Sequence, residues 1–294
     1  MKVILIELAV IVAVALVLYL IRNKIRFFRG GYVVRRDSYM QDDKMKLLIE
    51  DTKFFKGKER NNRSLRVDGS NLVYSRIPLD KENKVLMVYS YCAPLLAMVK
   101  GGGVSLKRTL VLGGGGSAVP LYIAQSYDKT KVDVVEINGE SIRISKEYFV
   151  KDYVGEGGQV NMILADAKNA VKTLEAPYQF IFCDLYIGGQ PADVVYDVEF
   201  MQEISRLAGE NGMLVINGGS LNTLGVRILL TSMLSTFKNA WAMLLTEGFV
   251  LVASNKDMPA MESLMQAGGV IAMYPNMLVE ADIRKDIERL NTEE

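Results

Sequence analysis

The sequence predicts an α/β fold in which a mainly parallel β-sheet carries helices on both faces. From residue 109, apolar runs typical of strands alternate with segments of helical periodicity. The alternation ends in two apolar runs joined at Glu247-Gly248, which is a hairpin signal. The chain has 294 residues, half of them apolar, enough for one large domain and a smaller unit. We therefore expect the sheet to finish in an antiparallel pair.

Each element of this domain follows from its local pattern. Five short apolar segments have the composition of strands buried on both faces. They are Thr109–Leu112, Val132–Ile137, Val160–Leu164, Phe180–Leu185 and Met213–Asn217. Helices are expected at Ala118–Ser126, Glu140–Phe149, Ala167–Leu174, Val198–Ala208 and near Asn222–Phe237.

The first 22 residues predict a membrane anchor. Val3–Ile21 is apolar apart from Glu7, and a helix of that length spans a hydrocarbon core of about 30 Å. A run of basic residues follows, from Arg22 to Arg36. By the positive-inside rule, it places the rest of the chain in the cytoplasm, where the basic run would touch anionic lipid. The expected location is therefore single-pass in a membrane, with the folded domain cytoplasmic.

Composition divides the chain into five segments. We expect a transmembrane anchor at 1–22, a basic and polar juxtamembrane linker with one or two short helices at 23–60, a small β-rich unit at 61–105, the α/β domain at 106–260, and a C-terminal helix and charged tail at 261–294.

The composition also excludes several kinds of chemistry. The chain has no histidine, so a Ser-His-Asp triad and a histidine-ligated metal site are impossible, and we expect no metal. A general base must be Asp, Glu, Tyr or Lys. Cys92 and Cys183 lie far apart in apolar runs, as expected for buried reduced thiols. The net charge of +1 gives no reason to expect nucleic-acid binding.

A glycine-rich turn predicts a nucleotide site. In "TLVLGGGGSAVPLYIAQ", Gly113, Gly115 and Ala118 fit the G-x-G-x-x-G/A pattern between a strand and a helix. Glu136 ends the next strand and Asp166 follows the third, where carboxylates can accept hydrogen bonds from a ribose and an adenine amino group. NAD and S-adenosylmethionine-type ligands both use this arrangement. The second type is favoured, because no second mononucleotide-binding half follows.

These motifs resemble the spermidine synthases, the polyamine aminopropyltransferases. The resemblance runs from Leu72 to Asn255 through "LVLGGGGS", "VDVVEINGESIRISKEYF", "MILADAKNAV", "YQFIFCDLY" and "DVEFMQEISRLAGENGMLVIN". It implies a Rossmann-like sheet of seven strands, like that of class I methyltransferases, with a terminal antiparallel hairpin and a small N-terminal β unit. It also makes a homodimer plausible by analogy.

The resemblance assigns roles to several residues. The glycines that would cradle decarboxylated S-adenosylmethionine, or its methylthioadenosine product, are Gly113, Gly114, Gly115 and Gly116. Glu136 with Ile137 would hold the ribose, and Asp166 with Ala167 would read the adenine. Asp184 would be the catalytic base that deprotonates the attacking amine. Its alternative role is to line the site without catalysing.

The chain departs from the family where the polyamine binds. An acid of the family pattern is replaced by Gly116, another by Ile187, and "VYSYCAP" stands in place of a Tyr-His-Glu segment. A dication needs carboxylates to offset its desolvation, so tight putrescine binding is not expected. Tyr89, Tyr91 and Tyr186 could line the acceptor cavity instead, or be ordinary half-buried tyrosines. The glycine- and proline-rich segment 186–193 could close over the site as a gate, or be a plain connection.

We expect a transferase that uses a small-molecule nucleoside donor, S-adenosylmethionine or its decarboxylated form, with an unidentified small acceptor. The transferred group would be aminopropyl or methyl, with S-adenosylhomocysteine as the product of methyl transfer. The alternatives are a pseudoenzyme that keeps a thioadenosine pocket, an S-adenosylmethionine-dependent methyltransferase and, more weakly supported, an NAD-binding protein.

Overall fold

The computed structural model contains two compact units, Met1–Leu86 and Met87–Glu294. The described residues are 10–19, 24–40, 43, 45–55, 61–70, 72–79, 105–127, 129–151, 160–187, 190–219, 223–245, 248–256 and 270–274. The predicted site residues Tyr89 and Tyr91 lie outside these ranges, as does Cys92.

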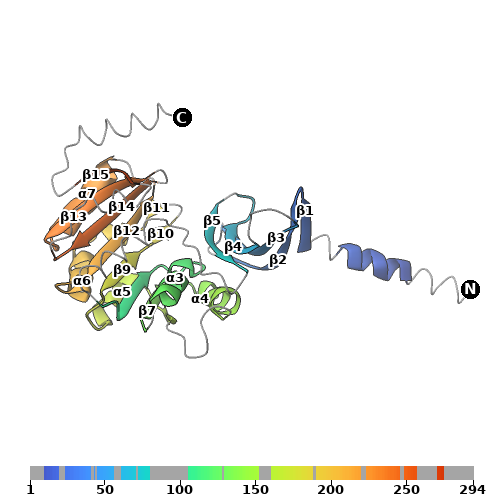
Figure 1. Cartoon of the computed structure of the whole chain (residues 1–294), viewed down its shortest axis with the longest axis horizontal. Helices are drawn as coiled ribbons and strands as arrows, with labels where there is room; N and C mark the ends of the chain where they lie inside the picture. The colour runs from blue at the N-terminus through green and yellow to red at the C-terminus, as the bar shows by residue number, and fades with distance from the viewer. Residues whose placement is uncertain are drawn as a thin grey trace, which may run out of the picture. The chain divides into compact units, whose positions relative to one another are not determined.

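The first unit contains a five-stranded antiparallel sheet whose strands neighbour one another in chain order (Figure 1). The strands are β1 Ile25–Phe28, β2 Gly31–Met40, β3 Lys46–Phe54, β4 Asn62–Val67 and β5 Val73–Pro78. Leu47, Ile49, Leu65 and Ile77 are almost fully buried, so apolar packing stabilises this sheet. Acidic side chains of β3 pair with arginines on the strands to either side.

The described part of residues 23–60 differs from the expected linker with short helices, because it forms β1, β2 and β3. The alternation typical of strands is concealed in this stretch. Charged residues occupy strand positions on both faces of the sheet, and they form ion pairs between β2 and β3. Arg35 pairs with Glu50, and Arg36 pairs with Asp51.

The predicted membrane location is wrong. Of the predicted anchor at 1–22, only residues 10–19 lie within the described ranges, and they are helical. Nowhere in the described ranges is there a helix that combines the length and apolar character needed to cross a membrane. This finding overturns the expected anchor, its lipid contact and the cytoplasmic placement derived from it.

The second unit is built on an eight-stranded sheet of order β15-β13-β14-β12-β9-β6-β7-β8. The strands are β6 Arg108–Leu112, β7 Lys131–Glu136, β8 Val160–Leu164, β9 Phe180–Cys183, β12 Met213–Gly219, β13 Asn239–Leu245, β14 Gly248–Ser254 and β15 Val270–Tyr274. The pairs among β8, β7, β6, β9 and β12 are parallel. β14 and β13 are antiparallel. The predicted mainly parallel sheet with a terminal hairpin is therefore confirmed.

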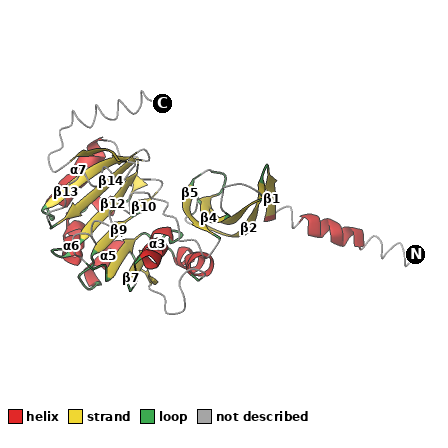
Figure 2. Ribbon diagram, viewed as in Figure 1, coloured by secondary structure: helices red, strands yellow, loops and turns green. Residues whose placement is uncertain are grey.

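Helices lie along this sheet (Figure 2), and their buried side chains belong to two separate cores. The helices are α3 Ala118–Ser126, α4 Gly139–Ile144, α5 Ala167–Thr173, α6 Val198–Ala208 and α7 Thr223–Leu234. α5, α6 and α7 share a core with Leu110 and Leu112, whereas α3 shares one with Val111. Because successive strand residues point to opposite faces, helices cover both sides of the sheet.

The C-terminal segment contains a strand that the sequence pattern did not predict. We expected a helix and tail at 261–294, but Val270–Tyr274 forms β15 and pairs antiparallel with β13. Its five residues follow two glycines and precede a proline, which is consistent with a short edge strand.

Candidate functional site

The glycine loop follows β6 and packs against the end of β9. The N–H of Gly113 donates to the carbonyl of Val135 at 2.9 Å, and its φ of +92° favours glycine. A Cβ atom at Gly113 would lie only 2.9 Å from the carbonyl carbon of Asp184. Glycine at this position therefore lets the loop contact the backbone of the predicted base.

The next glycine contacts the carboxylate at the end of β7. The N–H of Gly114 donates to Oε2 of Glu136 at 3.1 Å, and the N–H of Asn138 donates to Oε1 at 2.9 Å. Glu136 is 9% exposed. Burial and the two hydrogen bonds together hold its carboxylate in place. Each carboxylate oxygen has a second lone pair, so Glu136 can still accept a hydrogen bond from a ligand hydroxyl. The neighbouring Ile137 is 65% exposed.

Asp166 follows β8 and caps α5. Its Oδ1 accepts a hydrogen bond from the N–H of Lys168 at 2.7 Å, which satisfies one of the unpaired donors of the first turn. Asp166 is exposed and Ala167 is buried. The side chain predicted to read an adenine thus also has a structural role.

Asp184 lies just after β9 and is held by β6 and β12. Its N–H donates to the carbonyl of Leu112 at 2.8 Å. Its Oδ1 accepts a hydrogen bond from Nδ2 of Asn217 at 2.9 Å, and Oδ1 of Asn217 accepts one from the N–H of Gly219 at 3.1 Å. The amide of Asn217 is thereby oriented to donate to the carboxylate of Asp184.

Asn217 is not among the site residues predicted from the sequence. The available signal was its position as the polar residue that ends the run "MLVIN", the carboxyl end of the fifth predicted strand. Ligands of open α/β sheets bind beyond such strand ends.

Tyr186 follows Asp184 in a short hairpin formed by β10 Tyr186–Ile187 and β11 Gln190–Pro191. Its hydroxyl donates to the carbonyl of Asn217 at 3.1 Å. Burial raises the pKa of Tyr186, and the negative charge of Asp184 raises it further. The hydroxyl therefore stays protonated, and its proton is donated to the backbone. The side chain of Ile187, by contrast, is 75% exposed.

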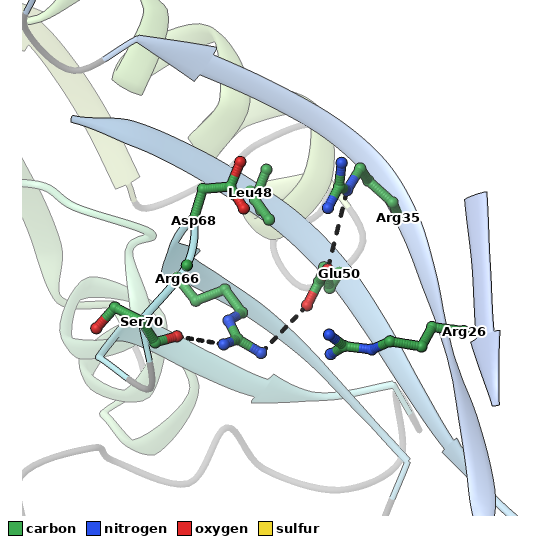
Figure 3. Close-up of a pocket in the computed structure, with 8 residues that line it drawn as sticks. Arg26, Arg35, Leu48, Glu50, Arg66, Asp68 and Ser70 are labelled. Carbon is green, nitrogen blue, oxygen red and sulfur yellow. Dashed lines mark hydrogen bonds and ion pairs between the residues drawn. The ribbon is translucent and has the colours of Figure 1, made fainter. Parts of the chain in front are cut away.

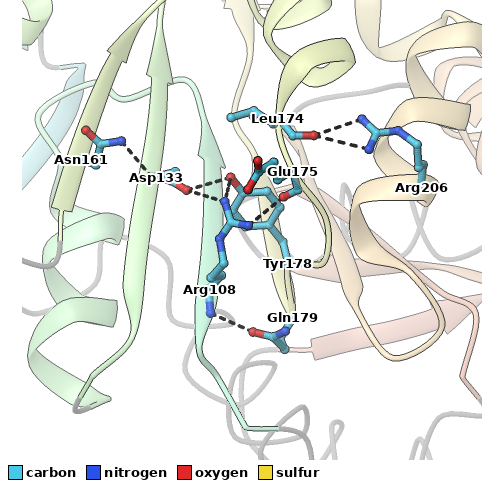
Figure 4. A network of polar contacts seen from close by, with 8 residues as sticks. All are labelled: Arg108, Asp133, Asn161, Leu174, Glu175, Tyr178, Gln179 and Arg206. Carbon is cyan, nitrogen blue, oxygen red and sulfur yellow. Dashed lines mark hydrogen bonds and ion pairs between the residues drawn. The ribbon is translucent and has the colours of Figure 1, made fainter.

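A polar network at the opposite ends of β6, β7 and β9 keeps these strands in register (Figure 4). The hydroxyl of the fully buried Tyr178 donates to Asp133 at 2.7 Å. Arg108 donates to the same carboxylate oxygen at 3.2 Å and stacks 4.3 Å above the centre of the Tyr178 ring. Burial raises the pKa of Tyr178, and its hydrogen bond to Asp133 adds to the rise.

Together, the structure brings the glycine loop, Glu136 and Asp184 to neighbouring strand ends. The carboxyl end of β8, followed by Asp166, lies beside that of β7. Within the described ranges, no group of acidic or cysteine side chains is arranged to hold a metal ion.

This strand order and the placement of the site define a protein with the class I methyltransferase-like fold. The crystal structure of a probable spermidine synthase from Corynebacterium glutamicum superposes with a TM-score of 0.67 at 20% sequence identity, covering 85% of this chain and 92% of that one.

The chain belongs to the spermine/spermidine synthase family, since the spermine/spermidine synthase domain matches residues 90–242, just over half of its length. A polyamine aminopropyltransferase of Vibrio vulnificus is 29% identical over 121 residues, 40% of each chain. Polyamine aminopropyltransferase 1 of Pseudomonas aeruginosa is 26% identical over 116 residues, 39% of this chain and 41% of the relative. The chain thus matches about two fifths of the length of these relatives.

Proposed function

We propose that this protein is a transferase of the aminopropyltransferase type, with an S-adenosylmethionine-type sulfonium donor and an acceptor other than putrescine. One observation carries the proposal. Consecutive glycines of one loop contact the backbone of Asp184 and the carboxylate of Glu136. The candidate base and the candidate ribose ligand are therefore held by a single turn.

The residues fit a nucleoside donor. A Cβ atom at Gly115 would meet nothing within 4 Å, so the loop has open space on that side. Glu136 has acceptor capacity left for ribose hydroxyls. Ile137 and Leu164 are exposed apolar side chains, at 65% and 64%, at the ends of neighbouring strands. They offer apolar surface to an adenine ring, and Asp166 can accept from its amino group.

In this proposal the donor supplies a sulfonium centre with its own leaving group, and the protein positions the acceptor and moves a proton. An ammonium must lose a proton before its nitrogen can act as a nucleophile. Asp184 accepts that proton, and Asn217 orients its carboxylate through the 2.9 Å hydrogen bond. Alignment of acceptor and donor supplies the rest of the acceleration.

The missing acids favour an acceptor with less positive charge than putrescine. Gly116 has no carboxylate, and Ile187 presents an exposed apolar side chain. A desolvated second ammonium would therefore lack a counter-charge at these positions. A monoamine or a neutral nucleophile avoids that cost.

Two measurements test the proposal. Calorimetry with methylthioadenosine, S-adenosylhomocysteine, decarboxylated S-adenosylmethionine and NAD should detect binding of the thioadenosines and not of NAD. Incubation with each donor and a panel of amines, read by mass spectrometry, should reveal an added aminopropyl or methyl group that Asp184→Asn abolishes. Absence of thioadenosine binding would refute the donor assignment, and efficient turnover of putrescine would refute the acceptor argument.

The second candidate is a binding protein that keeps the nucleoside site without turnover. The exposed, uncharged Ile187 favours it, since a lost acceptor site is expected of a pseudoenzyme. Thioadenosine binding without product from any amine, and with equal affinity in Asp184→Asn, would establish this alternative.

A further inference from the structure

The five-stranded sheet of the first unit contains a cavity of about 330 Å³ that is lined mainly by charged side chains (Figure 3). Arg26 of β1, Arg35 of β2 and Arg66 of β4 extend into it around Glu50 of β3. A cavity of this size is at the lower end of the range for small-molecule sites.

The guanidinium groups in this cavity are only loosely paired. Glu50 lies 3.9 Å from Nε of Arg35 and 3.5 Å from Nη1 of Arg66. Arg66 also donates to the carbonyl of Ser70. The Nε atoms of Arg35 and Arg66 are buried and have no hydrogen-bond partner among the described residues. Apart from the backbone pairing of β1 with β2, Arg26 makes no hydrogen bond or ion pair among the described residues.

The adjacent position on β3 provides an internal comparison. Asp51 accepts hydrogen bonds from Arg36 at 2.7 Å and from Arg63 at 2.6 and 3.0 Å. One carboxylate and two arginines thus satisfy one another there. The same combination around Glu50 leaves buried donors unused, and a third guanidinium is added. Because Glu50 is shared at longer range between two guanidinium groups and Arg26 adds a third, the cavity is suited to an additional hydrogen-bond acceptor of negative charge.

The charges around the cavity indicate the kind of ligand that would accept these hydrogen bonds. Three arginines and two acids, Glu50 and Asp68, line the cavity, and Lys46 lies 4.0 Å from Asp68. Positive charge therefore remains in excess. Guanidinium groups converge from three different strands, which matches a tetrahedral oxyanion with several acceptor oxygens better than a planar, singly charged carboxylate.

We propose that Arg26, Arg35 and Arg66 form a site for a phosphate group, either free phosphate or the phosphate of a small monoester. This site is formed by residues of the first unit alone, whereas the glycine loop belongs to the second unit. It gives the first unit a ligand of its own.

The test uses the 294-residue chain and one matched pair of variants. Arg26→Gln removes a guanidinium that makes no other bond within the described residues, so the fold is expected to persist. Arg29→Gln removes the same charge from the exposed turn of the same hairpin, outside the cavity. Inorganic phosphate, phenyl phosphate and acetate are titrated by calorimetry at constant ionic strength, with and without saturating methylthioadenosine.

We expect phosphate to bind saturably, with about tenfold weaker affinity in Arg26→Gln and less than about a twofold change in Arg29→Gln. Methylthioadenosine should leave the affinity unchanged. Tighter binding of phenyl phosphate than of phosphate would indicate a monoester ligand, and equal binding would indicate free phosphate. The proposal is overturned if phosphate does not bind, if acetate binds equally well, or if both variants weaken binding to the same extent.

Discussion

Replacing Gly113 by alanine should destabilise the second unit by two separable effects. The φ of +92° is unfavourable for an L-residue with a Cβ atom, at about 1–2 kcal/mol. The new Cβ would lie 2.9 Å from the carbonyl carbon of Asp184, closer than real contacts allow. Relieving such overpacking by a backbone shift costs about 1–3 kcal/mol. The expected loss in the free energy of unfolding is therefore about 2–5 kcal/mol.

Gly115→Ala is the matched control. Its φ is also positive, at +45°, but a Cβ atom there would meet nothing within 4 Å. Gly115→Ala should therefore show only the conformational cost of a positive φ. The free energies of unfolding of the two variants should differ by about 1–3 kcal/mol.

Urea unfolding followed by tryptophan fluorescence measures this difference. Trp241 is the only tryptophan of the chain and is 7% exposed in a core of the second unit. The signal therefore reports on the unit that contains the glycine loop. Equal losses in Gly113→Ala and Gly115→Ala would refute the proposed close approach of the loop to Asp184.

Three further predictions concern other residues. Asn217→Ala should lower turnover about tenfold to a hundredfold, which corresponds to the free energy of one hydrogen bond to a charged group. The affinity for methylthioadenosine, measured by calorimetry, should be unchanged. An equal loss of turnover and affinity would contradict an orienting role. Asp51→Ala should cost about 3–5 kcal/mol, since it leaves Arg36 and Arg63 without their buried partner. Burial by itself raises the pKa of Asp51, but the hydrogen bonds and charges of Arg63 and Arg36 outweigh burial and hold the pKa below its usual value. Its stabilisation should thus be present above about pH 4 and be lost as the pH falls through the lowered pKa, an acid-side slope in urea midpoints that Asp51→Ala should lack. Burial raises the pKa of the Cys183 thiol to about 12, so above about pH 8.5 the thiol ionises in the unfolded chain but not in the folded one. The free energy of unfolding should therefore fall by about 1.4 kcal/mol per pH unit above that pH. The same slope between pH 8.5 and 10 in Cys183→Ala would contradict this assignment.

The second unit was predictable from sequence because its central strands are buried on both faces. Val111 packs in one core and Leu110 and Leu112 in the other, so the strand is uniformly apolar and stands out between glycines and polar loops. In the first unit the sequence indicated the β-rich stretch that contains β4 and β5, but it gave no such signal for β1, β2 and β3. Asp51 is 1% exposed but reads as a surface residue, because its charge is balanced by arginines on strands that only the fold brings alongside it.

The same distinction applies to the site. Glu136 and Asp184 could be predicted because each follows a recognisable strand, and strand ends are where such sheets bind ligands. The contact between Asn217 and Asp184 could not, since the two residues are 33 positions apart and meet only when β9 pairs with β12. Nor does the sequence indicate that the hydroxyl of Tyr186 donates to a backbone carbonyl.

The engagement of Tyr186 limits how this residue could contact an acceptor. Its hydroxyl donates to the carbonyl of Asn217, and a Cβ atom at Gly219 would collide with that hydroxyl. Glycine at 219 is thus required for the observed position of the tyrosine. In this arrangement the hydroxyl proton is already donated, so Tyr186 can offer an amine substrate only the lone pairs of its hydroxyl oxygen and the face of its ring. An aromatic face attracts a single ammonium without providing a formal counter-charge. That property agrees with an acceptor that has one amine to be deprotonated by Asp184, rather than with a diamine whose second charge would need a carboxylate of its own.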